Sequence, residues 1–198
     1  MPKGIPLTEE DQERRRHEIF HQVVPIFMKK GFQETSMQEI ANAAGLGKST
    51  LYDYFQTKDE ILVYFFEDQW NDVIEEAQKI AVQNCSADVR LRKITEAYLE
   101  SLQANKSLFL KLSVESQRLK LESQKQIQDK RHAYQDMIRA LIEEGIREGI
   151  FRQVNSLLAA RLLVGNIGLV LYGSRLTGTP QNMLQDTLDI FFKGIEAC

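Results

Sequence analysis

Two short stretches of the sequence combine residue types whose spacing could support chemistry. Residues 45–50 read GLGKST, and a glycine-rich turn followed by Lys and Ser is typical of loops that bind phosphate. Residues 17–21 read HEIFH, which has the H-E-x-x-H spacing of zinc-dependent proteases. The first stretch suggests a nucleotide or a nucleic-acid backbone as the partner, and the second suggests a hydrolase. Each interpretation requires further residues that can be checked along the chain.

A nucleotide-binding P-loop requires a glycine five residues before Gly47 and a β-strand leading into the loop. That position holds Asn42, and the preceding residues have the apolar spacing of a helix. Both requirements therefore fail, and the sequence argues against a nucleotide site.

A zinc site at HEIFH is possible in principle, because His17 and His21 would lie one turn apart on a helix. A catalytic zinc needs a third protein ligand, but the only other histidine is His132 and nothing indicates an acidic ligand. Ile19 and Phe20 belong to the apolar side of this helix, so we expect the histidines to face solvent. We therefore expect no metal, no cofactor and no catalytic residue, and a zinc-dependent hydrolase remains only as an alternative.

The composition suits a cytoplasmic protein with one large domain or two small ones. The chain has 198 residues, is 43% hydrophobic and carries a net charge of −3, so it is not a basic coat for nucleic acid. Lys and Arg outnumber Asp and Glu only between Arg14 and Lys58, which suggests an anionic partner near that segment. Cys85 and Cys198 form no C-x-x-C pair. We expect no signal peptide and no contact with a membrane, since the longest apolar run is short and interrupted by glycines.

The spacing of apolar residues predicts an all-α protein, because long stretches without proline repeat apolar residues every three or four positions. The first helix should begin at Thr8 and end at Gly31, with Pro25 as a kink or weak point. Further helices are expected from the caps and breaks over residues 36–44, 48–55, 57–82, 87–104, 107–119, 123–148, 156–176 and 180–195.

A helix-turn-helix is predicted over about residues 36–55. Ser36 as N-cap and Glu39 three residues later form a capping box, Gly45-Leu46-Gly47 makes a turn, and a short helix follows that buries Leu51 and Phe55. The second helix of such a motif enters the major groove of DNA. The phosphates expected near GLGKST are therefore those of double-stranded DNA.

Residues 31–62, GFQETSMQEIANAAGLGKSTLYDYFQTKDEIL, closely resemble the N-terminal domain of the tetracycline-repressor (TetR) family. The resemblance extends over about residues 12–62, and EEGIREGIFR at 143–152 is similar to a weaker recurrent feature of the family's C-terminal domain. It implies a ligand-responsive transcriptional regulator, most often a repressor. The implied division is an N-terminal three-helix helix-turn-helix DNA-binding domain over residues 1–60 and a C-terminal helical effector-binding and dimerisation domain over 61–198.

The resemblance also implies which residues touch an operator, either at bases or at the DNA backbone. These residues are Thr35, Ser36, Lys48, Ser49, Thr50, Tyr52, Tyr54 and Lys58. The chemistry of Lys48 agrees, because a lysine at a helix start can reach guanine acceptors or a phosphate. Three features depart from the family pattern: Gly47 replaces a frequent Ser cap, Asp53 puts a carboxylate on the recognition helix, and Pro25 interrupts the first helix. Arg14–Arg16 could contact phosphate or be solvated.

The last two predicted helices are apolar on more than one side, so one face should cover the domain and the other should meet a second copy. A single large monomeric core is the alternative. The resemblance implies a four-helix homodimer interface, for which the candidates are Leu169, Leu184, Leu188, Phe191 and Phe192. It also implies a pocket among the middle helices for a mainly hydrophobic small-molecule effector. The candidate lining residues, each of which could instead be core, are Trp70, Tyr98, Phe109, Tyr134, Asn166 and Tyr172.

Overall fold

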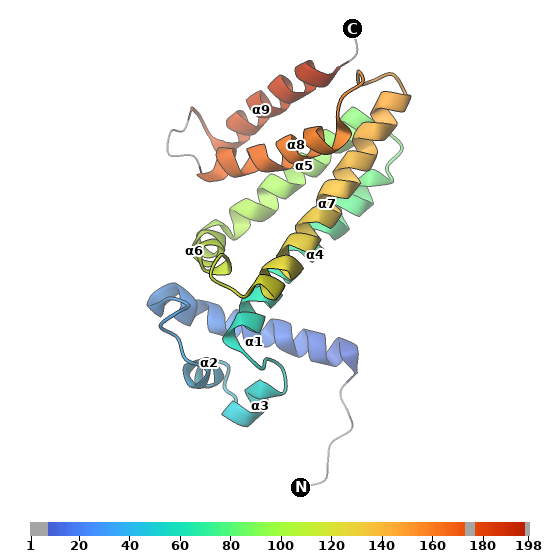
Figure 1. The fold of residues 1–198 in the computed structure, drawn as a ribbon. Coiled ribbons are helices and arrows are strands. Elements are labelled where there is room, and N and C mark those ends of the chain that lie inside the picture. Colours follow the sequence, from blue (N-terminus) through green and yellow to red (C-terminus); the bar gives the residue numbers. More distant parts are fainter. Residues whose placement is uncertain (1–7, 173–176, 197–198) are drawn as a thin grey trace. The chain divides into compact units, whose positions relative to one another are not determined.

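The computed structural model describes residues 8–172 and 177–196, without the side chains of residues 169, 171 and 172. Within these residues the only β feature is an isolated bridge between Phe151 and Glu196, so the all-α prediction is confirmed (Figure 1). The helices are α1 (Glu9–Lys30), α2 (Met37–Ala43), α3 (Lys48–Tyr52), α4 (Lys58–Ala81), α5 (Ala87–Ala104), α6 (Lys106–Ser116), α7 (Leu121–Arg147), α8 (Ser156–Tyr172) and α9 (Pro180–Ile195). Residues 173–176, with which the eighth predicted helix was expected to end, lie outside the described part.

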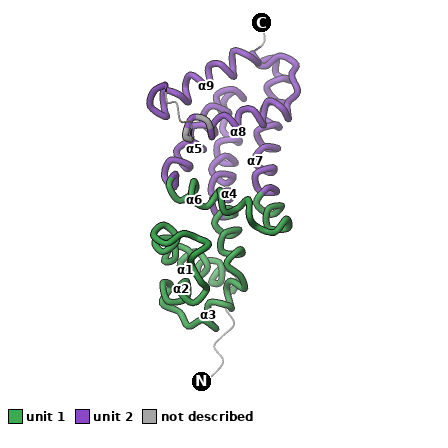
Figure 2. Tube along the Cα trace, turned by 60° about the vertical axis from the view of Figure 1, so that its left-hand side comes forward, with its two compact units in different colours: residues 1–67, 107–127 green, residues 68–106, 128–198 purple. Residues whose placement is uncertain are grey.

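The first compact unit comprises residues 1–67 and 107–127 (Figure 2). Its core is rich in aromatic side chains, and the rings of Phe20 in α1 and Phe65 in α4 stack with centroids 5.3 Å apart. Leu112 in α6 and Leu119 belong to the same core, although they lie far along the chain. The unit therefore combines the N-terminal helices with a segment from the middle of the sequence.

The ends of α1 follow from local capping. The Thr8 hydroxyl accepts a hydrogen bond from the Asp11 amide at 3.1 Å, and Gly31 adopts φ 95°, a value that favours glycine. The Gly31 amide donates to the Phe27 carbonyl at 3.0 Å. The helix boundaries expected at Thr8 and Gly31 are confirmed. Between them α1 continues as one helix through Pro25.

The second compact unit comprises residues 68–106 and 128–198. In it α8 packs against both α5 and α9, and α5 also contacts α9 (Figure 1). Gly145 in α7 makes room for the Phe151 ring, because a Cβ at position 145 would lie 2.4 Å from that ring. Phe151 stacks in turn on Phe192 of α9, with centroids 6.0 Å apart. The EEGIREGIFR stretch thus packs the end of α7 and the last helix, α9, against the same Phe151 ring.

The boundaries between the two units fall within α4 and α7 and after the first residue of α6. The predicted division of the chain near residue 60 remains a prediction, since residues 107–127 group with the N-terminal helices.

Candidate nucleic-acid interface

The start of α2 is fixed by a complete capping box. The Ser36 hydroxyl accepts a hydrogen bond from the Glu39 amide at 3.3 Å, and the Glu39 carboxylate accepts from the Ser36 amide at 2.9 Å. Lys30, at the end of α1, places its Nζ 2.6 Å from the other oxygen of Glu39. These interactions, with the Lys30 hydrogen bond first, lower the pKa of Glu39 from 4.5 to about 2. The capping box therefore also ties α2 to the end of α1.

The turn between α2 and α3 depends on Gly45, whose φ of 64° lies in the left-handed region that favours glycine. The Leu46 amide donates to the Ala41 carbonyl at 2.9 Å and closes the turn. α3 is shorter than the predicted helix over residues 48–55, because the amides of Asp53 and Tyr54 bond to carbonyls three residues back and tighten the last turn. The residues of GLGKST thus set the geometry between two helices.

The short α3 has a buried side and an exposed side. Leu51 and Phe55 are fully buried and hold it on the core of the first unit. Lys48, Ser49 and Thr50 are exposed at its start. This arrangement presents one ammonium group and two hydroxyl groups to solvent. All three groups can donate hydrogen bonds to base edges and phosphates, and the two hydroxyls can also accept from amino groups on base edges.

Three further residues are predicted to contact DNA: Tyr52 at the end of α3, Tyr54 just after it, and Ser36 at the start of α2. Tyr52 and Tyr54 are half-buried, and the Lys48 Nζ lies 6.0 Å from the centroid of the Tyr52 ring. Asp53 is exposed at the end of α3, as the sequence predicted. Ser36 is exposed, but its hydroxyl already accepts the capping-box hydrogen bond from the Glu39 amide.

Thr35 and Lys58 make internal contacts at the edge of this surface. Thr35 is only 1% exposed, and its hydroxyl donates to the Gly31 carbonyl at 2.6 Å. The Lys58 ammonium donates to the carbonyls of Phe32 at 2.9 Å and Gln33 at 2.8 Å, and burial lowers the pKa of Lys58. Lys58 therefore joins the start of α4 to the loop after α1. An ammonium has three N–H bonds, so one donor remains for a phosphate.

Arg16 has a positioning role that sequence reasoning missed. Its guanidinium lies 4.8 Å from the centroid of the Phe55 ring and 4.9 Å from that of Tyr64, so it links α1 to the end of the α3 segment and to α4. Arg14 instead pairs with Asp11 on α1, at 2.7 Å. The only sequence signal was that position 16 precedes Phe20 by one turn on the apolar side of α1.

Known sequence families match both units. The profile described as "Bacterial regulatory proteins, tetR family" matches residues 24–65, and the profile "Tetracyclin repressor-like, C-terminal domain" matches residues 84–172. The chain belongs to the TetR family. It is therefore a ligand-responsive, DNA-binding transcriptional regulator, and the alternative of a zinc-dependent hydrolase has no support.

The individual relatives share only low sequence identity with this chain. The Fatty acid metabolism regulator protein of Bacillus subtilis (strain 168) is 23% identical over 151 residues, which cover 76% of this chain and 78% of the relative. The crystal structure of FadR from Bacillus subtilis in complex with stearoyl-CoA has a TM-score of 0.78 at 20% identity, covering 91% of this chain and 99% of that one. The structure of AibR in complex with isovaleryl coenzyme A and operator DNA has a TM-score of 0.65 at 20% identity, covering 90% and 98%. The two structures show that the fold is shared.

As in other TetR-family chains, a second helical unit follows the DNA-reading helices, and here three predicted effector residues meet in it. The Trp70 ring lies 5.7 Å from both Tyr98 and Tyr134, and the two tyrosine rings are 5.2 Å apart. All three are buried, and burial raises the pKa of Tyr134. We refer to these three residues as the aromatic cluster.

The other predicted effector residues lie elsewhere. Phe109 contacts Phe66 in the core of the first unit, with ring centroids 5.7 Å apart, and Asn166 lines a groove between α8 and α9. The side chain of Tyr172 lies outside the described part. The predicted set is therefore divided, and only the aromatic cluster forms one group.

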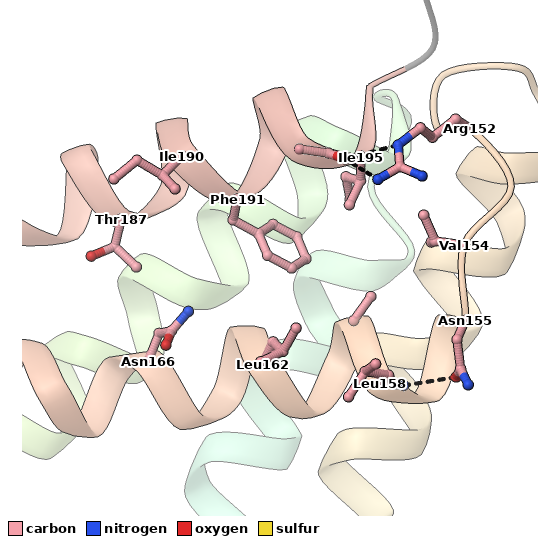
Figure 3. A pocket seen from close by; sticks show the side chains of 12 residues that line it. Arg152, Val154, Asn155, Leu158, Leu162, Asn166, Thr187, Ile190, Phe191 and Ile195 are labelled. Carbon is pink, nitrogen blue, oxygen red and sulfur yellow. Dashed lines mark hydrogen bonds between the residues drawn. The ribbon is translucent and has the colours of Figure 1, made fainter.

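The groove between α8 and α9 has a volume of about 570 Å³ and is lined largely by apolar side chains (Figure 3). Phe191 reaches from α9 toward α8, and its neighbours include Leu158, Leu162 and Ile190, which are 53%, 52% and 75% exposed. We call this feature the α8–α9 groove.

No helix within the described residues is long and apolar enough to span a membrane.

The residues predicted for a homodimer interface divide between this groove and the interior. Leu184, Leu188 and Phe192 are buried in the second unit, because a step of four residues repeats them along the inner side of α9. Phe191 lies on the groove side, and the side chain of Leu169 is outside the described part. The sequence placed these residues of α9 on one apolar stripe but did not show which part of it faces inward.

Proposed function

We propose that this chain is a repressor that binds an inverted-repeat DNA operator as a homodimer and releases it when an acyl-coenzyme A thioester binds. The observation that carries the proposal is the geometry of α3, the second helix of a capped helix-turn-helix. Its Leu51 side chain is fully buried, and the polar residues at its start are exposed. A surface of this kind suits a hydrated, anionic partner with donor and acceptor groups.

In this proposal α3 lies in the major groove of the operator. Lys48, Ser49, Thr50 and Tyr52 contact bases and adjacent phosphates. The residues around α3 contact the DNA backbone, and these are Thr35, Ser36, Tyr54 and Lys58. For Thr35 the contact would have to replace an internal hydrogen bond, since its hydroxyl donates to the Gly31 carbonyl at 2.6 Å and its amide to the Phe32 carbonyl at 3.3 Å. Support comes from the fold shared with AibR, which is described with operator DNA.

The homodimer forms in this proposal through the α8–α9 groove. Leu158, Leu162 and Ile190, beside the half-buried Phe191, give the second unit an exposed apolar surface, which is typical of a surface that another protein covers. A second copy presents the same surface, so the contact can be two-fold symmetric. Two recognition helices would then meet two successive major grooves, about 34–36 Å apart.

The proposed effector class rests on two relatives and on the aromatic cluster. FadR is described with stearoyl-CoA and AibR with isovaleryl coenzyme A. In this chain Trp70, Tyr98 and Tyr134 form a buried, mainly apolar group that could enclose an acyl chain by changing rotamers. The effector would therefore be mainly hydrophobic at the end that enters the protein.

The link between effector and DNA runs in this proposal through α6. The chain leaves the second unit after α5, and α6 then packs in the core of the first unit through Leu112. The Lys111 ammonium donates to the Met28 carbonyl of α1 at 2.6 Å, and the Gln33 amide donates to Glu115 at 2.6 Å. An effector that shifts α5 or α7 would pull on these contacts, and differential affinity for the two states would release the operator.

The single tryptophan of the chain, Trp70, allows a direct test. Acyl-CoA thioesters of increasing chain length should change its fluorescence and weaken operator binding, measured by fluorescence anisotropy, by about tenfold or more. Free coenzyme A and the free fatty acids serve as matched controls and should act much more weakly. If no thioester alters either signal while the operator still binds, the effector class is wrong although the DNA-binding function stands.

A further inference from the structure

The rings of the two histidines of HEIFH lie against each other on one side of α1. On α1 the Nε2 atoms of His17 and His21 are 3.0 Å apart, and their ring centroids are 4.3 Å apart. Both side chains are exposed. One ring donates its Nε2–H and the other accepts it, and when the donor ring carries its proton on Nδ1 instead, both Nε2 lone pairs point into the space between the rings.

This spacing is the one that a chelated metal ion needs. Two imidazole nitrogens that bind one ion at about 2.0–2.1 Å, with about 90° between the bonds, lie about 2.9 Å from each other. We propose that His17 and His21 form a two-histidine site for a late first-row transition-metal dication, with Cu²⁺ bound most tightly. The order follows from the general rise of affinity toward Cu²⁺ for nitrogen ligands and from the right angle, which suits its tetragonal geometry.

The surroundings indicate binding without hydrolysis. Glu18, the residue that would act as general base in a zinc protease, is held by Arg15 at 2.6 Å. One turn before His17, the Glu13 carboxylate faces Arg16 at 3.9 Å, and one turn after His21 stands Pro25. In the part of the chain that the structure describes, no three or more His, Cys, Asp or Glu residues are grouped for a metal. Water would therefore complete the coordination.

The ion would act on the DNA-reading unit through α1. Chelation joins two side chains across one helical turn, and the same helix supplies Phe20, Val23 and Phe27 to the core of the first unit. An ion that binds the folded helix and not the unfolded chain stabilises the folded form by mass action. Metal binding should therefore raise the melting temperature of the protein.

The test uses the full chain purified without a histidine tag. Titration with CuSO₄ by calorimetry should show one tight site, and electron paramagnetic resonance should show two nitrogen ligands on the bound Cu²⁺. His17→Gln and His21→Gln should each weaken binding by about tenfold or more, because chelation becomes single-point binding. His132→Gln is the control, since His132 is a lone exposed histidine on α7 and its loss should leave the affinity unchanged.

The single variants decide the outcome. Equal losses in His17→Gln and His21→Gln support the site, whereas a loss in only one, in neither, or in His132→Gln overturns it. Circular dichroism without metal checks that each variant is folded, which is expected because both histidines are exposed. As a second measurement, CuSO₄ should raise the melting temperature of the wild type and of His132→Gln but not of the other two variants.

Discussion

The helices α3 and α9 each bury one side and expose the other, but the exposed sides differ in chemistry. α3 buries Leu51 and shows Lys48, Ser49 and Thr50 to solvent. α9 buries Leu188 and shows an apolar surface whose most exposed large side chain is Ile190, at 75%. The first kind of surface suits a hydrated and charged partner, and the second suits a partner that removes it from water.

The two helices also differ in what positions them. The start of α2 and the turn into α3 are fixed by hydrogen bonds between residues three to five apart, as in the capping box and the Leu46 amide. The inner side of α9 is fixed by packing with residues far along the chain, such as Phe151 against Phe192. A polar, locally capped helix can therefore be read from a short segment, whereas an apolar helix needs its neighbours.

The largest effect is expected from truncating Leu51, the buried side chain that anchors α3. Leu51→Ala should lower the free energy of unfolding by about 2–5 kcal/mol, because it leaves a cavity at a fully buried position. Ser49→Ala on the same helix should change it by less than about 0.5 kcal/mol, since Ser49 is exposed. Urea unfolding of both variants measures the difference. Equal costs for the two would mean that α3 is not anchored through Leu51.

The apolar side of α9 is tested by a charge. Ile190→Glu should break the proposed homodimer and weaken operator binding by about a hundredfold, because each subunit would then contact DNA alone. Gln153→Glu adds the same charge at an exposed position that does not line the α8–α9 groove and should change neither property. Light scattering and DNA titration on one sample provide both measurements. A monomeric Ile190→Glu variant with wild-type operator affinity would contradict the dimer.

Alanine substitutions at two glycines of the second unit should change the free energy of unfolding in opposite directions. Gly145→Ala should destabilise the protein by about 1–3 kcal/mol, because the added Cβ would meet the Phe151 ring. Gly165→Ala in α8 should stabilise it by about 0.5–1 kcal/mol, since the new Cβ would meet nothing within 4 Å beyond its own stretch of helix backbone and alanine favours a helix. Thermal or urea unfolding gives the two signs. A neutral Gly145→Ala would show that α7 does not close on Phe151 as described.

The smallest effect is expected at acidic pH, where the contribution of Glu39 in the capping box to stability is lost. The folded-state pKa of Glu39 is about 2, below the ordinary 4.5, so its contribution is fully present above pH 4.5 and is lost as the pH falls toward 2. The difference in unfolding free energy between the wild type and Glu39→Gln should therefore shrink across that window. Unfolding curves at pH 6, 4.5 and 3 check this. A difference that does not vary with pH would mean that Glu39 is not held as a carboxylate.

Most of the fold could be predicted from the sequence, because helix ends are local. The caps at Thr8 and Ser36, and the glycine at position 31, mark boundaries that the structure confirms. The end of α3 could not be placed, since its last turn is tightened by hydrogen bonds that no residue type announces.

The sites divide in the same way. The exposed start of α3 was predictable from apolar spacing around Leu51. The contact of Arg16 with Phe55 and Tyr64 was not, because it joins three segments of the chain. The inward position of Leu188 was equally hidden, since both sides of α9 carry apolar residues and only packing decides which is covered.

The central claim, that α3 reads DNA through its exposed polar start, is tested most directly by selecting binding sites from random DNA. The wild type should yield an inverted repeat with half-sites about 34–36 Å apart. Lys48→Ala should change the preferred base at one position of each half-site, at a cost of about 1–3 kcal/mol for the original base. Lys29→Ala removes an exposed lysine at the end of α1 and should return the wild-type sequence. An unchanged consensus for Lys48→Ala, or no inverted repeat for the wild type, would contradict the account.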